Sequence, residues 1–170
     1  MERHVTPKIN TNKCTVKAIY FDMDGTIADL YGYPSWLEAL RAERIEPYIE
    51  YGDCLDNINE LVIVLDGFKA LGITIGVISW GAKNATTAYT RKVKSAKRQW
   101  IKQRYPQMLQ EFHVVKYGTP KHKVRKIQNS ILVDDNAEVR EQWDGDTIDA
   151  TDTKKMLKSL QMILDALTQE

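Results

Sequence analysis

The sequence predicts an α/β protein with a three-layer, Rossmann-like fold, in which a parallel sheet carries helices on both faces. Short apolar runs alternate along the chain with segments of helical periodicity, and this alternation is typical of parallel sheets. Several of the runs end in polar residues, at the edge of the sheet where doubly wound proteins bind their ligands. At 170 residues, the chain is expected to form one domain over residues 1–170.

Five segments are predicted to form the strands of this sheet. Four are short apolar runs of the kind that is buried on both faces of a parallel sheet, and the fifth is an edge strand. In chain order they cover residues 14–21, 73–79, 112–116, 130–134 and 147–149. The polar residues 1–13 that precede them are expected to be a loosely tied lead-in.

Helices are predicted between the strands from capping residues and apolar spacing. Ser35 is expected to cap a helix that runs to about Glu46, where Pro47 stops it. The other helices are expected over residues 57–71, 83–104, 136–143 and 153–167, with one more that starts at Thr119-Pro120.

The 83–104 helix has a basic polar face. Its inward face is expected to consist of Tyr89, Val93, Ala96, Trp100 and Ile101. Its outward face carries Arg91, Lys92, Lys94, Lys97, Arg98 and Lys102. We interpret these cations as a solvated face, and the alternative is a face that follows a nucleic-acid backbone.

Composition and charge argue against several classes of partner. The net charge is +1, with 43% hydrophobic and 28% charged residues, which is ordinary for a globular protein and predicts no general polyanion-binding surface. No apolar run is long enough to cross a membrane, and no secretory signal is recognisable. Cys14 and Cys54 lack metal-ligand spacing and are expected to be free thiols. The sequence therefore predicts a cytoplasmic protein without a membrane partner, and it leaves the oligomeric state open.

The first predicted strand leads into two aspartates, Asp22 and Asp24. Side chains alternate along an extended backbone, so both carboxylates point the same way. They repel each other unless a cation lies between them or one of them is protonated. Gly25 permits a tight turn, and Thr26 offers a hydroxyl and a backbone N–H to an anion. These groups are suited to magnesium-assisted chemistry on a phosphate.

The segment Asp22-Met23-Asp24-Gly25-Thr26 resembles the first signature of the haloacid dehalogenase (HAD) superfamily, Asp-x-Asp-Gly-Thr. The resemblance implies a HAD-like fold, with Asp22 as the phosphoryl-accepting nucleophile and Asp24 as the general acid/base. Three later segments resemble the remaining signatures, in the same order along the chain.

Ser79, at the end of the second predicted strand, matches the second signature, whose hydroxyl hydrogen-bonds the transferring phosphoryl group. The third signature is a lysine that offsets the charge of nucleophile and phosphate, and Lys121 and Lys123 are both candidates. We favour Lys121, because it directly follows the expected helix start. Asp134 and Asp135 match the fourth signature, a strand that ends in two acids.

The resemblance also implies a cofactor, Mg²⁺. Asp22, Asp134 and the backbone carbonyl of Asp24 would bind it, in keeping with the preference of Mg²⁺ for hard oxygen ligands. Asp135 is expected to orient Lys121 or a metal-bound water rather than to bind the metal.

In HAD proteins the segment after the first signature forms a flap beside the active site. Residues 27–55 fit such a flap with a small helical insert, and no segment is long enough for a cap domain. Tyr31, Tyr33 and Trp36 either border the substrate pocket or pack in the interior. The expected site is therefore open.

The implied activity is Mg²⁺-dependent hydrolysis of a phosphomonoester through an aspartyl-phosphate intermediate. The predicted substrate is a nucleotide or another small phosphorylated metabolite. Two alternatives stay open: a phosphatase that acts on nucleic-acid ends, and a non-catalytic binding protein of the same fold. The catalytic candidates are Asp22, Asp24, Ser79 and Lys121, and the metal candidates are Asp22, Asp24 and Asp134.

Overall fold

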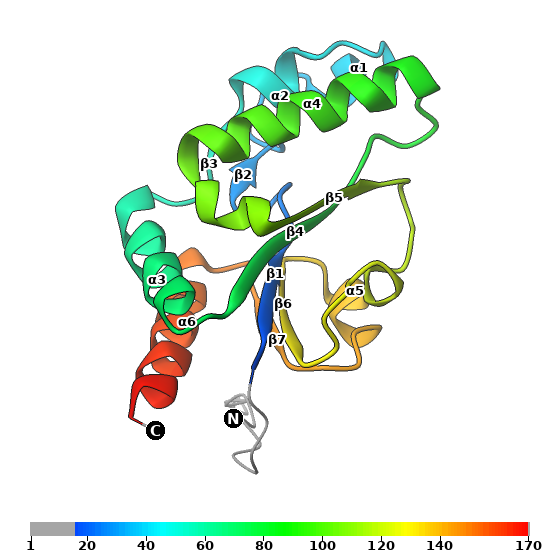
Figure 1. The fold of residues 1–170 in the computed structure, drawn as a ribbon. Helices are drawn as coiled ribbons and strands as arrows, with labels where there is room; N and C mark the ends of the chain where they lie inside the picture. Colours follow the sequence, from blue (N-terminus) through cyan, green and yellow to red (C-terminus); the bar gives the residue numbers. More distant parts are fainter. Residues whose placement is uncertain (1–15, 170) are drawn as a thin grey trace, which may run out of the picture.

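The computed structural model describes residues 16–169, so the predicted lead-in at 1–13 and Cys14 lie outside the described residues. The chain forms an α/β fold in which helices flank a five-stranded parallel sheet of order β5-β4-β1-β6-β7 (Figure 1). The strands are β1 (Ala18–Phe21), β4 (Thr74–Trp80), β5 (Glu111–Val115), β6 (Ser130–Asp134) and β7 (Thr147–Asp149). The predicted fold class is confirmed at this level, and β6 and β7 have the predicted bounds.

The central strand, β1, lies between β4 and β6. Phe21 is in register with Val77 on one side and with Val133 on the other. All four residues of β1 are completely buried, because both faces of the sheet are covered, and this explains why the strand is a continuous apolar run. The chain moves outward from β1 to β4 and β5, then crosses back to β6. The direction of the strand order therefore reverses between β1 and β6, which is where ligands bind in doubly wound folds.

Alternate residues of β1 face two different helical layers. Ile19 and Phe21 belong to a large core cluster with α3 (Ile58–Ala70), α4 (Thr87–Arg104) and α6 (Thr153–Thr168). Tyr20 belongs to a smaller cluster beside α5 (Ala137–Glu141), where its ring lies 6.1 Å from that of Trp143. The three layers that the sequence predicted are therefore present.

An insert follows β1, over the residues that were predicted to form a flap. Its two short strands, β2 (Ala28–Asp29) and β3 (Gly52–Asp53), pair antiparallel. Between them lie α1 (Trp36–Arg41) and α2 (Glu46–Glu50), and Figure 1 shows both helices alongside α4.

The prediction of a single helix from Ser35 to Glu46 was wrong. The backbone turns left-handed at Glu43, with φ 53°, which separates α1 from α2. Pro47 lies in the first turn of α2 instead of ending a helix. Proline is tolerated there because a first-turn N–H has no partner within the helix.

Two other helix starts also differ from the predictions. The helix expected at Thr119-Pro120 is only a 3-10 turn, η2 (Lys121–Lys123), which has no side-chain cap. The Thr119 hydroxyl instead donates to the Lys116 carbonyl at 2.7 Å. Helix α4 begins at Thr87 rather than at 83, because the Thr86 hydroxyl oxygen accepts the Tyr89 N–H and so forms the cap. A second 3-10 segment, η1 (Pro106–Gln110), connects α4 to β5. Within residues 16–169, no helix has the length and apolarity needed to cross a bilayer.

Candidate functional site

A cavity of about 440 Å³ opens at the carboxyl ends of β1, β4 and β6. Four aspartates and a buried lysine from the ends of β1 and β6 and from η2 line it: Asp22, Asp24, Asp134, Asp135 and Lys121. Its other lining residues come mainly from the insert and from the loops after β4 and β5. The cavity thus lies at the point where the strand order reverses.

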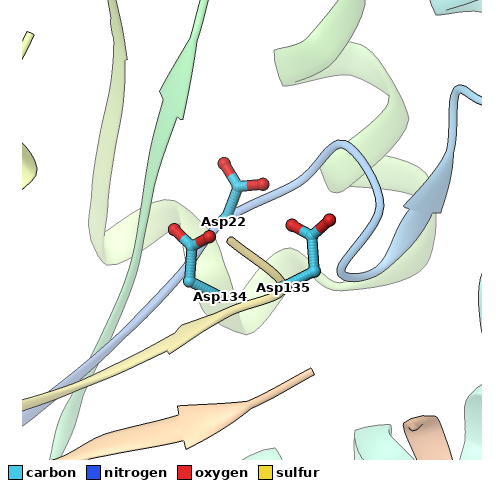
Figure 2. Close-up of side chains that lie close together, drawn as sticks. All are labelled: Asp22, Asp134 and Asp135. Carbon is cyan, nitrogen blue, oxygen red and sulfur yellow. The ribbon is translucent and has the colours of Figure 1, made fainter. Parts of the chain in front are cut away.

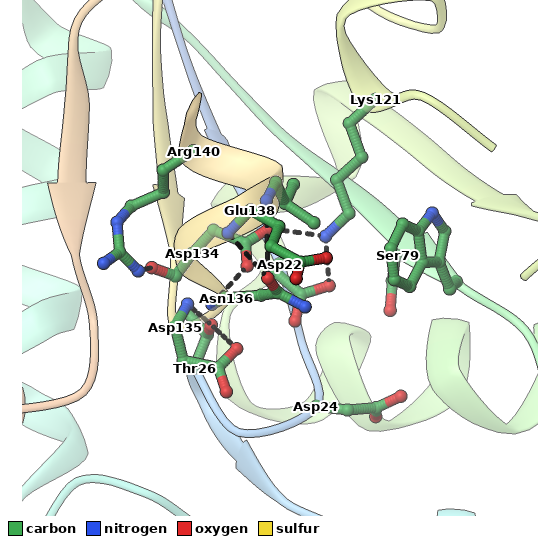
Figure 3. Close-up of polar contacts among 12 residues, drawn as sticks. Asp22, Asp24, Thr26, Ser79, Lys121, Asp134, Asp135, Asn136, Glu138 and Arg140 are labelled. Carbon is green, nitrogen blue, oxygen red and sulfur yellow. Dashed lines mark hydrogen bonds and ion pairs between the residues drawn. The ribbon is translucent and has the colours of Figure 1, made fainter. Parts of the chain in front are cut away.

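Lys121 joins the ends of the two central strands. Its Nζ donates to Asp22 Oδ1 at 2.6 Å and to Asp134 Oδ2 at 2.7 Å (Figure 3). Burial by itself would lower the pKa of Lys121, but the two carboxylates outweigh burial and the pKa is raised. The ammonium therefore stays charged. Lys123 is exposed, so of the two candidate lysines the structure places Lys121 in the site.

Asp22, Asp134 and Asp135 form a cluster of carboxylates. One oxygen from each lies within 4.8 Å of the other two, and Figure 2 shows the three groups converging from the loop after β1 and the end of β6. Burial, with a contribution from the charge of Asp22, raises the pKa of both Asp134 and Asp135 to about 6. A set of oxygen donors this close together suits a hard divalent cation. The structure therefore adds Asp135 to the predicted metal candidates.

The turn after β1 holds this cluster in place. The Thr26 hydroxyl donates to Asp135 Oδ1 at 3.3 Å and accepts the Asp135 N–H at 3.1 Å. Thr26 is completely buried, so its hydroxyl joins the two acidic loops and, contrary to the prediction from the sequence, is not available to a bound anion such as a phosphate. Gly25 has φ +84°, and a Cβ there would lie 2.5 Å from Asp135 Oδ2. Only glycine fits this turn.

Asp24 lies apart from the contacts around Lys121 (Figure 3). Its Oδ2 accepts a 2.6 Å hydrogen bond from Lys97 Nζ, and its side chain is 16% exposed. Its Oδ1 is buried and has no hydrogen-bond partner among residues 16–169. Burial raises the pKa of Asp24, the Lys97 charge opposes that effect, and the net result is a raised pKa.

Lys97 was wrongly predicted to lie on the solvated face of the helix. It is completely buried on α4, and its ammonium donates to three acceptors: Asp24 Oδ2, Ser79 Oγ at 2.9 Å and the Trp80 carbonyl at 2.8 Å. The signal was present in the spacing, because Lys97 is four residues from both Val93 and Ile101, and these share the buried face.

The other predicted catalytic residue, Ser79, is also completely buried. Its hydroxyl oxygen accepts from Lys97, and Ser79 is not among the residues that line the cavity. β4 alternates its side chains between the two faces of the sheet, and this alternation directs Ser79 toward α4. In this structure Ser79 therefore lies behind the site instead of facing a phosphate position.

Aromatic side chains form much of the remaining wall. Tyr31 and Trp36, from the insert, line the cavity with ring centroids 5.1 Å apart. Trp80, the last residue of β4, and Tyr117, from the loop after β5, line it with centroids 5.0 Å apart. Tyr33 is not a lining residue, and its hydroxyl bonds Glu50 at 3.2 Å. Two of the three aromatic residues that the sequence singled out thus border the cavity.

The comparisons with known proteins give no family for this chain: no protein-family model matches it, and no curated protein matches it significantly.

The raised pKa values of Asp134 and Asp135 predict a pH-dependent response to Mg²⁺. The folded protein retains protons on these groups up to about pH 6, whereas an unfolded aspartate releases its proton near pH ~4. The free energy of unfolding of the metal-free protein should therefore fall by ~1–3 kcal/mol as pH rises from about 4 to 6. Because Mg²⁺ binds the deprotonated groups, the stabilisation it gives should be larger at pH 7.5 than at pH 5.

Urea unfolding with and without Mg²⁺ at the two pH values would measure this difference. Asp56→Asn is the control, because Asp56 is exposed and distant in sequence from the cluster. An equal or larger Mg²⁺ effect at pH 5 would contradict the prediction.

Proposed function

We propose that this protein is a Mg²⁺-dependent phosphomonoester hydrolase of the HAD type. The observation that carries the proposal is the sharing of Lys121 by Asp22 and Asp134 at the ends of adjacent central strands, beside Asp24 in the same cavity. This arrangement supports the proposal, because a phosphoryl transfer through a covalent intermediate needs a nucleophile, a cation and a separate proton donor around one space. Membership of the HAD superfamily and a cytoplasmic location stay predictions from the sequence.

The residues present fit a magnesium ion. Asp22 and Asp134 would bind it, with the backbone carbonyl of Asp24, and Asp135 is close enough to supply a further oxygen. When bound, Mg²⁺ would neutralise negative charge on the phosphoryl oxygens. Lys121 supplies a second, permanent positive charge at the same place.

In the first chemical step, a carboxylate oxygen of Asp22 attacks phosphorus. A bond forms between that oxygen and phosphorus while the bond from phosphorus to the leaving oxygen breaks. Asp24 donates its proton to the leaving oxygen, and its raised pKa keeps that proton available in the folded protein. The products are an aspartyl phosphate on Asp22 and a neutral alcohol.

In the second step, Asp24 acts as a base. It takes a proton from a water molecule whose oxygen attacks phosphorus, and the bond between phosphorus and the Asp22 oxygen breaks. Inorganic phosphate leaves, and Asp22 and Asp24 return to their starting states. One residue therefore serves both steps, as acid and then as base.

The walls of the cavity favour a small substrate with a planar ring. One aromatic pair borders it from the insert, and the other from the end of β4 and the loop after β5. Aromatic rings bind planar ligands by stacking. Arg41 and Lys83 also line the cavity and could pair with a second anionic group. We therefore propose a nucleotide as the substrate.

A substrate on a nucleic-acid end is the second candidate. Five cations of α4, namely Arg91, Lys92, Lys94, Arg98 and Lys102, are exposed. None of them lines the cavity, so the smaller substrate is favoured. A purely binding role is disfavoured because the nucleophile, the acid and the lysine all meet at one cavity.

The two candidate lysines give the first test of this function. Lys121→Ala leaves two buried carboxylates without their shared cation, so kcat for 4-nitrophenyl phosphate should fall ~10²–10³-fold. Lys123→Ala is the matched control on the same turn, and it should stay within ~2-fold of the parent because its side chain is exposed. The reverse ranking would reassign the role to Lys123.

The two aspartates after β1 give a second test. Asp22→Asn should abolish turnover, because no aspartyl phosphate can form. Asp24→Asn should still accept phosphate from an ester with a good leaving group but release it ~10²-fold more slowly or worse. Acid quenching followed by mass spectrometry should therefore find phosphate on Asp22 in the Asp24→Asn protein. Near-normal turnover of Asp22→Asn would rule out this mechanism.

The substrate proposal is tested by comparing nucleoside 5′-monophosphates with ribose 5-phosphate, which lacks the ring. If the base stacks on the aromatic walls, kcat/KM should be ~10-fold or more higher for the nucleotide than for ribose 5-phosphate. Trp36→Leu should reduce this preference while leaving ribose 5-phosphate turnover within ~3-fold. A 5′-phosphorylated oligonucleotide that is preferred at low salt, and loses the preference at high salt, would favour the nucleic-acid alternative.

A further inference from the structure

We propose that Lys97 is a positioning residue for Asp24: its ammonium holds one carboxylate oxygen and so fixes the orientation of the carboxyl group beside the cavity. This inference rests on the proposed function, and it concerns a residue that no part of the sequence pattern assigned to the site. It explains why a helix that crosses over the sheet places a completely buried lysine next to the cavity without exposing it there.

Every N–H group of the Lys97 ammonium is hydrogen-bonded. A lysine ammonium has three N–H groups, and here each has an acceptor: Asp24 Oδ2 at 2.6 Å, Ser79 Oγ at 2.9 Å and the Trp80 carbonyl at 2.8 Å. The ring of Tyr48, from α2, lies 5.2 Å from the same nitrogen. The ammonium is therefore fixed from the insert and from the end of β4 at once, so the position of Asp24 Oδ2 is fixed with it.

The two oxygens of Asp24 have different surroundings as a result. Oδ2 is held by the short contact to Lys97, whereas Oδ1 is buried without a partner among the described residues. The contact between Oδ2 and Lys97 is therefore what sets the orientation of the Asp24 carboxyl group. Asp24 also lines the cavity, so the fixed carboxyl group adjoins the space for the leaving oxygen.

Lys97 itself is not a catalytic residue. It is completely buried and does not line the cavity, so it touches neither substrate nor metal. The competing explanation is that Lys97 only anchors α4 to the sheet. An anchor would affect every step of the reaction, whereas a positioning residue would affect only the steps that use Asp24.

A double-mutant cycle separates these explanations. The variants are Lys97→Met, Asp24→Asn and the two combined, with Lys94→Met as a control on an exposed position of the same helix. The substrate is 4-nitrophenyl phosphate with saturating Mg²⁺, because its leaving group departs without a proton. Stopped-flow release of 4-nitrophenolate then separates formation of the phosphoenzyme, seen as a burst, from its breakdown in the steady state.

Lys97→Met should give a burst at a rate within ~3-fold of the parent, followed by breakdown slowed ~10²-fold, the range expected for losing a general base. Asp24→Asn should behave the same way. In the combined variant, breakdown should be no more than ~3-fold slower than in Asp24→Asn, because Lys97 would have nothing left to position. Lys94→Met should match the parent in both phases.

Two results would overturn the proposal. The first is that Lys97→Met slows the burst as much as the breakdown of the phosphoenzyme. The second is that adding Lys97→Met to Asp24→Asn slows breakdown by a further ~10-fold or more. Lys97→Met alone leaves Asp24 unpaired and can fail to fold, whereas the combined variant lacks both charges. In that case the rates of breakdown in Asp24→Asn and in the combined variant decide the question. A parent that hydrolyses no phosphomonoester would refute the proposed function instead, and a parent that is active but shows additive losses would refute only the role of Lys97.

Discussion

Compensation of charge at the carboxyl ends of β1 and β6 is the constraint on which the rest of the site depends. Four aspartates line one cavity, and like charges this close destabilise a fold unless cations or protons offset them. Two buried ammonium groups do so in different places. Lys121 serves Asp22 and Asp134, and Lys97 serves Asp24. The remaining excess of negative charge, together with burial, raises the pKa of Asp24, Asp134 and Asp135, and it leaves the site able to accept a divalent cation.

This division of charge separates two tasks within one cavity. In the half around Lys121, a buried ammonium group lies between two carboxylates, as the proposed binding of a phosphate requires. The half around Lys97 keeps a single carboxyl group apart, with one oxygen held and the other without a partner among the described residues. Because the two lysines belong to different elements, η2 and α4, a substitution in one half can leave the other intact.

The topology of the sheet makes this arrangement possible. β1 and β6 are neighbours in space, although more than a hundred residues separate Asp22 from Asp134. The insert after β1 supplies one aromatic wall of the cavity, and the end of β4 with the loop after β5 supplies the other. The aspartates thus lie at or next to the ends of strands, which hold them rigidly. Most of the side chains that would contact a substrate lie on connecting segments, as is usual in doubly wound folds.

The sequence by itself determined the layers, the strands and the identity of the acids, because burial on both faces and the residues at strand ends leave local patterns. It also placed Lys121 correctly in the site. Tertiary structure decided the rest. The break between α1 and α2 depends on a left-handed backbone at Glu43, which the capping pattern does not reveal. Lys97 and Ser79 were misplaced because a lysine on an amphipathic helix and a serine at a strand end are usually solvated or capping groups. Only the packing of α4 against the sheet shows that Lys97 contacts both Asp24 and Ser79, and a contact across 73 positions of sequence leaves no periodic signal.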